Sequence, residues 1–137
     1  MGGKILIIGS GAREHAILKS LSNSKAENEL FCVGTNLNPG ISQICKEIVI
    51  KDINNTSLIT RYAKDRKISL AIVGPENPLE AGISNELLDI GIQVIGPKKE
   101  LAQIETSKTF TRNLLNEYNI PGGPKYKSFK SLVGCLL

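Results

Sequence analysis

The apolar positions of this sequence follow two patterns that alternate along the chain. Short runs of consecutive apolar residues are typical of strands buried in a parallel sheet, and they predict strands at residues 5–8, 30–33, 47–50, 70–73 and 92–95. Apolar residues three or four apart predict helices at residues 13–21, 58–63, 79–90, 98–104 and 108–118. This alternation predicts an α/β domain with an open, mainly parallel sheet and flanking helices.

The segments between these elements carry turn and capping signals. Residues 34–40 are rich in Gly and Asn and are expected to form a loop, and residues 120–124 are expected to open a linker. Asn55 or Thr56 is the expected cap of one helix, and Ser107 is the expected cap of another. These signals mark where the predicted helices begin and where loops connect the elements.

The first strand is followed directly by GSGAREH, residues 9–15, which predicts a glycine turn leading into a helix. The N-terminus of a helix presents unpaired N–H groups and a partial positive charge, so it favours a phosphate group. Glycine lets the backbone turn sharply and approach a ligand closely. The stretch therefore predicts a phosphate site at the end of the first strand.

The same stretch differs from a dinucleotide site in two respects. Glu14 occupies the position of the third fingerprint glycine, and residues 34–36 stand where an acidic residue would hold an adenosine ribose. Arg13 and His15 suit a terminal phosphate dianion, and Glu14 suits a hydroxyl or amine of the same ligand. The alternative interpretation is a polar helix start with His15 as a surface residue.

A second candidate is Glu76 in the stretch GPENPL, residues 74–79, which follows a predicted buried strand. Ligands of open α/β sheets bind at the edge where the strands end, so Glu76 is expected on the same edge as residues 9–15. A carboxylate between two prolines loses little freedom when it binds a hydroxyl or an amine. The alternative role of Glu76 is to cap the helix expected from Leu79.

Composition narrows the choice of ligand and compartment. The net charge is +4, but basic residues are interspersed with acidic ones and no aromatic ladder accompanies them, so we expect a small anionic ligand and no nucleic-acid partner. The three cysteines lack metal-site spacing, and no metal site is expected. No apolar run is long enough for a signal peptide or a membrane span, which makes the cytoplasm the simplest compartment and a membrane partner unexpected.

The last predicted helix and the residues after it do not complete another strand and helix unit. We therefore expect a domain at residues 1–105, followed at residues 106–137 by a helix and a linker that would lead into a domain absent from this chain. The apolar residues 132–137 could promote self-association or remain disordered.

Several stretches, taken together and in order, resemble phosphoribosylamine–glycine ligase, also called glycinamide ribonucleotide synthetase, an ATP-grasp family of purine biosynthesis. They are GSGAREHA at 9–16, VGPENPLEAGI at 73–83, IGP at 95–97, IETSKTF at 104–110 and NIP at 119–121. The resemblance extends from about residue 3 to residue 129. It implies a Rossmann-like pre-ATP-grasp domain that binds the phosphoribosyl substrate.

The resemblance also implies an activity and a set of residues. The family joins 5-phosphoribosylamine and glycine with ATP, which implies ATP and Mg²⁺ as cofactors of the complete enzyme and neither bound tightly to this chain. Substrate-binding residues implied by motif position are Gly9, Ser10, Gly11, Arg13, Glu14, His15 and Glu76. Lys108 matches a lysine that many ATP-grasp proteins direct at ATP phosphates. No catalytic residue is expected here, because the ATP-grasp portion would supply that chemistry.

The sequence departs from the family pattern at two places and leaves alternatives open. Ala12 replaces a glycine, and VGTN at 33–36 replaces a proline-glycine-asparagine turn, so contacts from that turn are not expected. The chain could be a fragment, a truncated copy or one piece of a split enzyme that associates with an ATP-grasp portion. A stand-alone phosphoribosyl-metabolite or dinucleotide binding module, and the corresponding domain of a related carboxylase, are the alternative interpretations.

Overall fold

A computed structural model describes residues 2–129. By its internal contacts the chain divides into two units, Met1–Ala102 and Gln103–Leu137. Each unit is described by itself. The expectation of self-association through residues 132–137 concerns residues that lie outside the described part.

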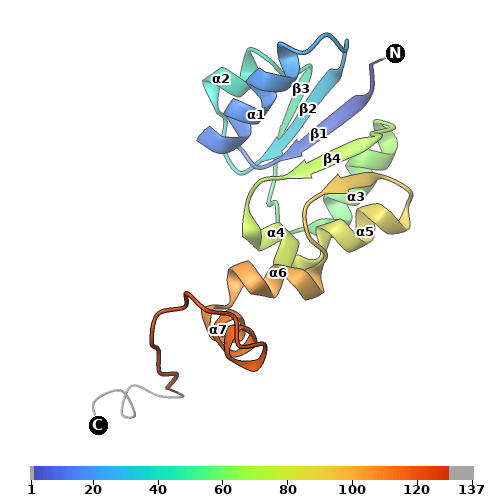
Figure 1. Ribbon diagram of the computed structural model, residues 1–137. Helices are drawn as coiled ribbons and strands as arrows, with labels where there is room; N and C mark the ends of the chain where they lie inside the picture. The colour runs from blue at the N-terminus through green and yellow to red at the C-terminus, as the bar shows by residue number, and fades with distance from the viewer. Residues whose placement is uncertain (1, 130–137) are drawn as a thin grey trace. The chain divides into compact units, whose positions relative to one another are not determined.

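The first unit is built on one sheet of parallel strands, so the predicted α/β fold with a parallel sheet is confirmed (Figure 1). The strand order is β3-β2-β1-β4-β5. The strands are β1 (Lys4–Ile8), β2 (Glu29–Gly34), β3 (Glu47–Ile50), β4 (Leu70–Val73) and β5 (Gln93–Ile95). The ranges predicted for β3 and β4 agree with the structure residue for residue.

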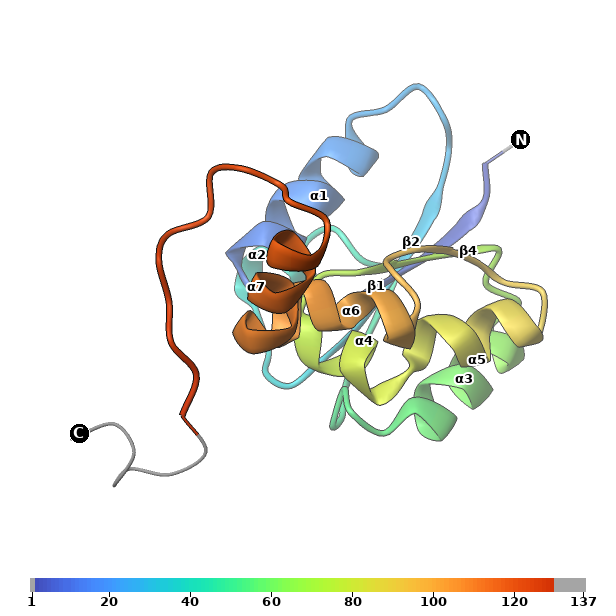
Figure 2. The ribbon, with the colours of Figure 1, turned by 60° about the horizontal axis from the view of Figure 1, so that its bottom comes forward.

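Helices cover both faces of this sheet, as Figure 2 shows. One face carries α1 (Ala12–Ser22) and α2 (Pro39–Ser42), and the other carries α3 (Thr56–Asp65), α4 (Glu76–Ala81) and α5 (Ile83–Asp89). Successive residues of a strand point to opposite faces. Ile5 and Ile7 of β1 therefore pack on the α1 side, while Leu6 and Ile8 pack on the α3 side.

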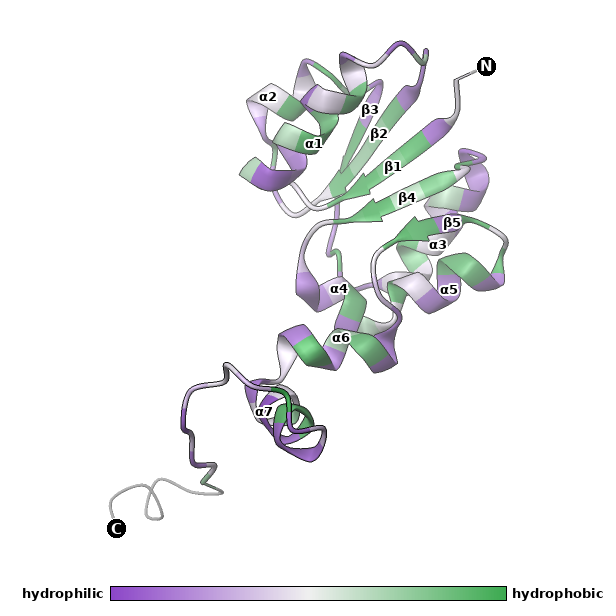
Figure 3. Ribbon diagram, viewed as in Figure 1, coloured by the Kyte–Doolittle hydropathy of each residue, from purple (hydrophilic) through white to green (hydrophobic). Residues whose placement is uncertain are grey.

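The hydropathy of each element follows from this layering (Figure 3). The central strands β1, β2 and β4 are almost continuously apolar because both of their faces are covered. The helices are apolar only on the side that meets the sheet; α3, for example, buries Ile59 and Ala63. Asn55 caps α3 by accepting a hydrogen bond from the amide of Leu58 at 3.1 Å, as expected.

Two predicted elements are corrected by the structure. The loop expected at residues 34–40 contains the start of the one-turn helix α2, whose length is too short to show a helical period. The single helix expected at 79–90 is two helices, because Gly82 has a left-handed backbone with φ of +99°. The first of them begins at Glu76, and Pro78 is tolerated there because it lies in the first turn.

The strand order reverses beside β1, and this reversal sets where a ligand can bind. The chain proceeds from β1 to β2 and β3 on one side, and then returns to place β4 on the other side of β1. Ile8 and Val73, the last residues of β1 and β4, are register partners. The turns after these two strands therefore adjoin at the topological switch point, where open α/β sheets bind ligands.

The second unit contains the end of α6 (Lys99–Thr106), which starts in the first unit, and α7 (Lys108–Glu117). Ser107 is the N-cap of α7, as expected, and accepts a hydrogen bond from the amide of Phe110 at 3.3 Å. Across residues 2–129, no helix has both the length and the apolar character that crossing a membrane requires.

Candidate functional site

The glycine loop, residues 9–11, joins β1 to α1 at the carboxyl edge of the sheet, the edge where the parallel strands end. Gly9 has a φ of +118°, which favours glycine over any other residue. Its N–H group donates to the carbonyl of Val33 at 2.8 Å, and its own carbonyl accepts from the thiol of Cys32 at 3.3 Å. Both polar groups of the Gly9 backbone are therefore held by β2.

The Glu14 side chain lies beneath this loop, where only 6% of it is exposed. Its Oε2 atom accepts a hydrogen bond from the amide of Gly11 at 2.7 Å, which is the return half of a capping box. Its Oε1 atom lies 3.2 Å from Nε of Arg13. The carboxylate therefore holds the backbone and the neighbouring guanidinium. Direct contact of Glu14 with a ligand stays a prediction.

The turn after β4 packs directly against the glycine loop. A Cβ atom added at Gly74 would collide with the Glu14 carboxylate, and one added at Gly9 would come within 2.8 Å of Cδ of Pro75. Two glycines thus let two loops approach at the switch point. The structure in this way brings residues 9–15 and the start of α4 to one edge.

Two charged groups extend from this edge toward solvent. The Arg13 side chain is 60% exposed although its Nε atom contacts Glu14. Glu76 is exposed at the first position of α4 and makes no side-chain capping bond, so it does not cap the helix that starts at its own position. Both side chains are accessible from solvent, although Arg13 is also held by Glu14.

His15 lies against α2, one helical turn away from the glycine loop. A Cβ atom added at Gly40 would come within 2.5 Å of the imidazole, so Gly40 gives the ring its space. The ring also lines a hollow of about 410 Å³ between α1 and α2, together with Lys19 and Gln43. Contact of His15 with a phosphate group stays a prediction.

Ser10 takes part in a network that the sequence did not indicate. Its hydroxyl donates to Oδ1 of Asn36 at 2.7 Å, and its carbonyl accepts from Nδ2 of Asn38 at 3.0 Å. Both asparagines lie in the loop between β2 and α2. The signal that could have found Asn38 is local, because an Asn directly before Pro-Gly is a typical helix cap, and Asn38 does cap α2.

Lys108, the residue predicted to contact ATP, belongs to the second unit. It is exposed at the first position of α7. Within that unit it lines a hollow of about 360 Å³ together with Arg112, Lys127, Tyr126 and Phe129. The hollow combines cationic and aromatic groups, a combination that fits a phosphate and a flat ring.

The two described cysteines carry no reactive thiolate. Burial raises the pKa of Cys32 to about 12, with smaller contributions from Cys45 and Glu14 nearby. Burial also raises the pKa of Cys45 to about 11. Both thiols are therefore protonated at neutral pH. No three His, Cys, Asp or Glu side chains gather in a metal-binding arrangement between residues 2 and 129.

The carboxyl edge presents donors for an anion beside an acceptor for hydroxyl or amine groups. The first intrahelical bond of α1 runs from the amide of His15 to the carbonyl of Gly11 at 3.1 Å. The amides of the three preceding residues open the helix and have no intrahelical acceptor. These amides and Arg13 can bind a phosphate, and the Glu76 carboxylate can accept from a sugar or an amine.

The reversed strand order and the glycine loop at the switch point define this unit as an open α/β domain, a class that binds its ligands at the carboxyl edge of the sheet. The family described as phosphoribosylglycinamide synthetase, N domain, matches residues 3–105. The chain belongs to this family, and the resemblance seen in the sequence is confirmed.

Comparisons with known proteins agree with this assignment. The phosphoribosylamine–glycine ligase of Methanosphaera stadtmanae is 44% identical over 129 residues, which are 94% of this chain and 29% of that protein. The structure of phosphoribosylglycinamide synthetase from Anaerococcus prevotii is similar with a TM-score of 0.63 and 18% identity, over 87% of this chain and 30% of that one.

A third similar protein is N5-carboxyaminoimidazole synthetase from Staphylococcus aureus, whose structure was solved in complex with ADP. It has a TM-score of 0.65 and 13% identity, over 85% of this chain and 30% of that one. At such identities the two structural comparisons establish a shared fold. The chain spans less than a third of the length of the curated relatives that it matches.

Proposed function

We propose that this chain is the N-terminal, substrate-binding part of a phosphoribosylamine–glycine ligase, which joins 5-phosphoribosylamine and glycine with ATP in purine biosynthesis. The observation that carries the proposal is the family match over residues 3–105, combined with a glycine loop and an exposed carboxylate at the switch point. The ligand of this part is a ribose 5-phosphate derivative that bears an amine.

In this proposal the 5-phosphate binds at the start of α1. The free amides of the first turn donate to its oxygens, and the partial positive charge of the helix start favours its negative charge. The exposed guanidinium of Arg13 adds a second charged donor, oriented through its contact with Glu14. Gly9, Ser10 and Gly11 supply the backbone that lets the ligand approach the helix.

Glu76 is assigned to the other end of the ligand. It is exposed at the start of α4, and the turn before it contacts the glycine loop through Pro75. A carboxylate in this position accepts hydrogen bonds from ribose hydroxyls or from the amine. The amine is the group that reacts with activated glycine, so Glu76 would orient the nucleophile.

ATP and Mg²⁺ belong to the complete enzyme in this proposal. The residues of the second unit fit a nucleotide, because Lys108 and Arg112 offer charge to phosphates and Tyr126 offers a ring. The similar Staphylococcus aureus protein was solved in complex with ADP, which supports the assignment of an adenine nucleotide to the complete enzyme. Bound ATP would activate the glycine carboxylate as an acyl phosphate. The catalytic groups for that step would lie outside this chain.

The test is calorimetric titration of the 137-residue chain with glycinamide ribonucleotide, ribose 5-phosphate and NAD in one buffer. We expect binding of the ribonucleotide and the sugar phosphate and none of NAD. Gly11→Val should abolish binding, because its Cβ atom would come within 2.8 Å of Oε2 of Glu14 and displace the carboxylate that holds the start of α1. Circular dichroism of the variant checks that it remains folded. Binding of NAD alone would contradict the proposal and favour the dinucleotide interpretation.

A second pair of variants tests Glu76. Glu76→Gln should weaken binding of glycinamide ribonucleotide by about tenfold, because a charged acceptor is lost. Glu80→Gln is the matched control, since Glu80 is an exposed residue one turn further along the same helix. Equal affinities for both variants would remove Glu76 from the site.

A further inference from the structure

The peptide unit between Ser10 and Gly11 is held from both ends by side chains. Its carbonyl oxygen accepts from Nδ2 of Asn38 at 3.0 Å, and its N–H group donates to Oε2 of Glu14 at 2.7 Å. A trans peptide is planar and its C=O and N–H groups point in opposite directions. The two side chains therefore fix the plane of this peptide as it enters α1.

This orientation determines which amides are available to a ligand. The Gly11 amide is already bound by Glu14, so it is not a donor for a phosphate group. The available donors of the first turn begin at Ala12, the first residue of α1. The direction of those donors follows from the plane of the peptide that precedes them.

Asn38 can hold this peptide because its own position is fixed. Its Oδ1 atom accepts from the amides of Gly40 and Ile41 at 3.0 and 3.4 Å, which caps α2. Ile41 is 1% exposed and packs in the apolar cluster between α2 and the sheet. The amide group of Asn38 therefore links an anchored helix to the backbone of the glycine loop.

The end of β2 and the loop that follows it also hold the Ser10 side chain in place. Oδ1 of Asn36 accepts from the hydroxyls of Ser10 and Thr35 at 2.7 and 3.1 Å. A Cβ atom added at Gly34 would collide with the Ser10 side chain. Ser10 is 8% exposed, and its hydroxyl is already engaged by Asn36.

We propose that Asn38 is a positioning residue of the phosphoribosyl site, which acts through the Ser10–Gly11 peptide and not by touching the ligand. This inference rests on the proposed function, because it assigns a role within that site. Removal of the Nδ2 donor leaves the Ser10 carbonyl without this bond. The peptide then rotates more freely, and the amides at the start of α1 lose their fixed direction.

The alternative is that Asn38 only caps a short helix. Asn55 separates the two roles, because it caps α3 with the same side-chain oxygen on the opposite face of the sheet. A serine at either position keeps a capping oxygen. It is too short to replace the Nδ2 atom that reaches Ser10. The same substitution therefore removes a link to the glycine loop at one site only.

The experiment compares Asn38→Ser and Asn55→Ser in the 137-residue chain. Titration with ribose 5-phosphate and glycinamide ribonucleotide gives affinities, thermal unfolding gives stability, and amide hydrogen exchange by NMR reports on Gly11. For Asn38→Ser we expect about fivefold weaker binding and about fivefold faster exchange at Gly11, from the loss of one hydrogen bond. Asn55→Ser should leave both quantities at their wild-type values.

Two results would overturn the inference. One is an unchanged rate of Gly11 exchange in Asn38→Ser, and the other is equal weakening of binding by both variants. If the wild-type chain binds neither compound, the proposed function fails at that point. The exchange rate at Gly11 then still decides whether Asn38 holds the peptide, because that measurement needs no ligand.

Discussion

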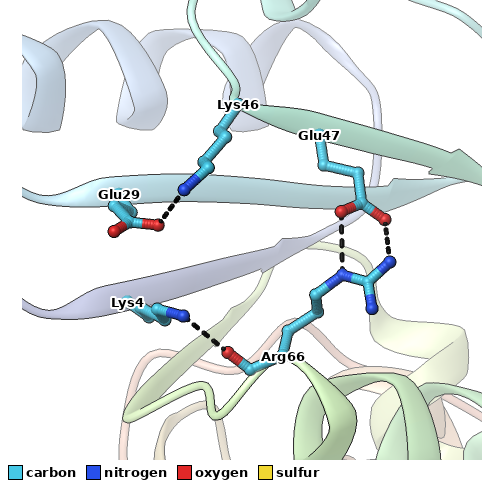
Figure 4. A network of polar contacts seen from close by, with 5 residues as sticks. All are labelled: Lys4, Glu29, Lys46, Glu47 and Arg66. Carbon is cyan, nitrogen blue, oxygen red and sulfur yellow. Dashed lines mark hydrogen bonds and ion pairs between the residues drawn. The ribbon is translucent and has the colours of Figure 1, made fainter.

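The two edges of the sheet are held together by different kinds of interaction. At the amino edge, where the strands begin, long charged side chains connect neighbouring elements (Figure 4). Lys46 lies 2.6 Å from Glu29, Arg66 forms two bonds of 2.8 Å with Glu47, and Lys4 donates to the carbonyl of Arg66 at 3.2 Å. These side chains are partly exposed, so their interactions are screened by water.

The carboxyl edge has the opposite construction. A glycine ends β2 and directly follows β1, β4 and β5. The buried carboxylate of Glu14 accepts from Gly11 and Arg13 of its own loop and packs against Gly74 of the turn after β4. Close backbone packing replaces long side chains at this edge.

The two edges differ in how far they tolerate changes in geometry. Exposed ion pairs contribute little to stability and tolerate small shifts in geometry. Packed glycines and a buried acceptor tolerate almost none, because a single added methyl group has no space. We therefore expect the carboxyl edge to hold its geometry more closely than the exposed ion pairs hold theirs, as a preorganised ligand site requires.

The largest effect that this comparison predicts is for Gly74→Ala. The new Cβ atom would displace the Glu14 carboxylate and break its bond with Gly11, which should lower the free energy of unfolding by about 2–3 kcal/mol. Gly3→Ala is the control at the amino edge. Its Cβ atom would meet only the tip of the Ser69 side chain at 3.0 Å. Chemical denaturation of both variants makes the comparison, and equal losses would contradict it.

The next effect concerns the two carboxylates that each accept two donors. In Glu14→Gln the amide NH₂ must face either the Gly11 amide or Arg13, both of which are donors, and we expect a loss of about 1–2 kcal/mol. Glu47→Gln creates the same mismatch with Arg66, but water can solvate the groups there. Urea unfolding should show a clearly smaller loss for Glu47→Gln. A larger loss of stability for Glu47→Gln than for Glu14→Gln would contradict the view that the carboxyl edge tolerates less change.

Elements with a repeating pattern were predictable from the sequence, and isolated contacts were not. The strands at 47–50 and 70–73 were found because consecutive apolar residues indicate burial on both sides. The helix α2 was missed because one turn has no period, and the break at Gly82 was missed because the apolar spacing continues through it. A periodic pattern records which face is buried and not where a backbone is interrupted.

The site divides in the same way. A glycine turn after a buried strand was enough to place residues 9–15 at the carboxyl edge, since parallel strands all end at the same edge. The hydrogen bonds that join Ser10 to Asn36 and Asn38 span 26 and 28 residues, and no local pattern encodes such contacts. The charge of Glu14 was visible in the sequence and its burial beneath the loop was not; its contact with a ligand stays a prediction.

The pH dependence of stability gives a smaller and more specific test of the amino edge. Hydrogen bonds from Lys46 and Arg66 lower the pKa values of Glu29 and Glu47, respectively. Their stabilisation is therefore present above the pKa of an unfolded Glu, about 4.3, and is lost as pH falls through the lowered values. Stability should be flat from neutral pH to about pH 5 and then fall.

Urea midpoints measured across this range would check the expectation. Glu47→Gln should fall less steeply with acid than the wild-type chain, because one of the two carboxylates no longer titrates. Added salt at about 0.5 M should reduce the wild-type fall, since the pairs are exposed to solvent. A fall of equal steepness in variant and wild type would assign the acid sensitivity to other groups.

The smallest expected effect is that of replacing a serine by alanine, which should change the free energy of unfolding in opposite directions at the two edges. Ser84 is fully buried beside Gly96, the residue after β5, and its hydroxyl has no hydrogen-bond partner among residues 2–129. Ser84→Ala should therefore raise the free energy of unfolding by about 0.5–1 kcal/mol. Ser69→Ala should lower it slightly, because that hydroxyl donates to the carbonyl of Lys4 at 3.0 Å. A lower free energy of unfolding for Ser84→Ala would mean that the hydroxyl has a partner, such as a buried water molecule. The buried polar groups at the carboxyl edge would then be as fully hydrogen-bonded as those at the amino edge.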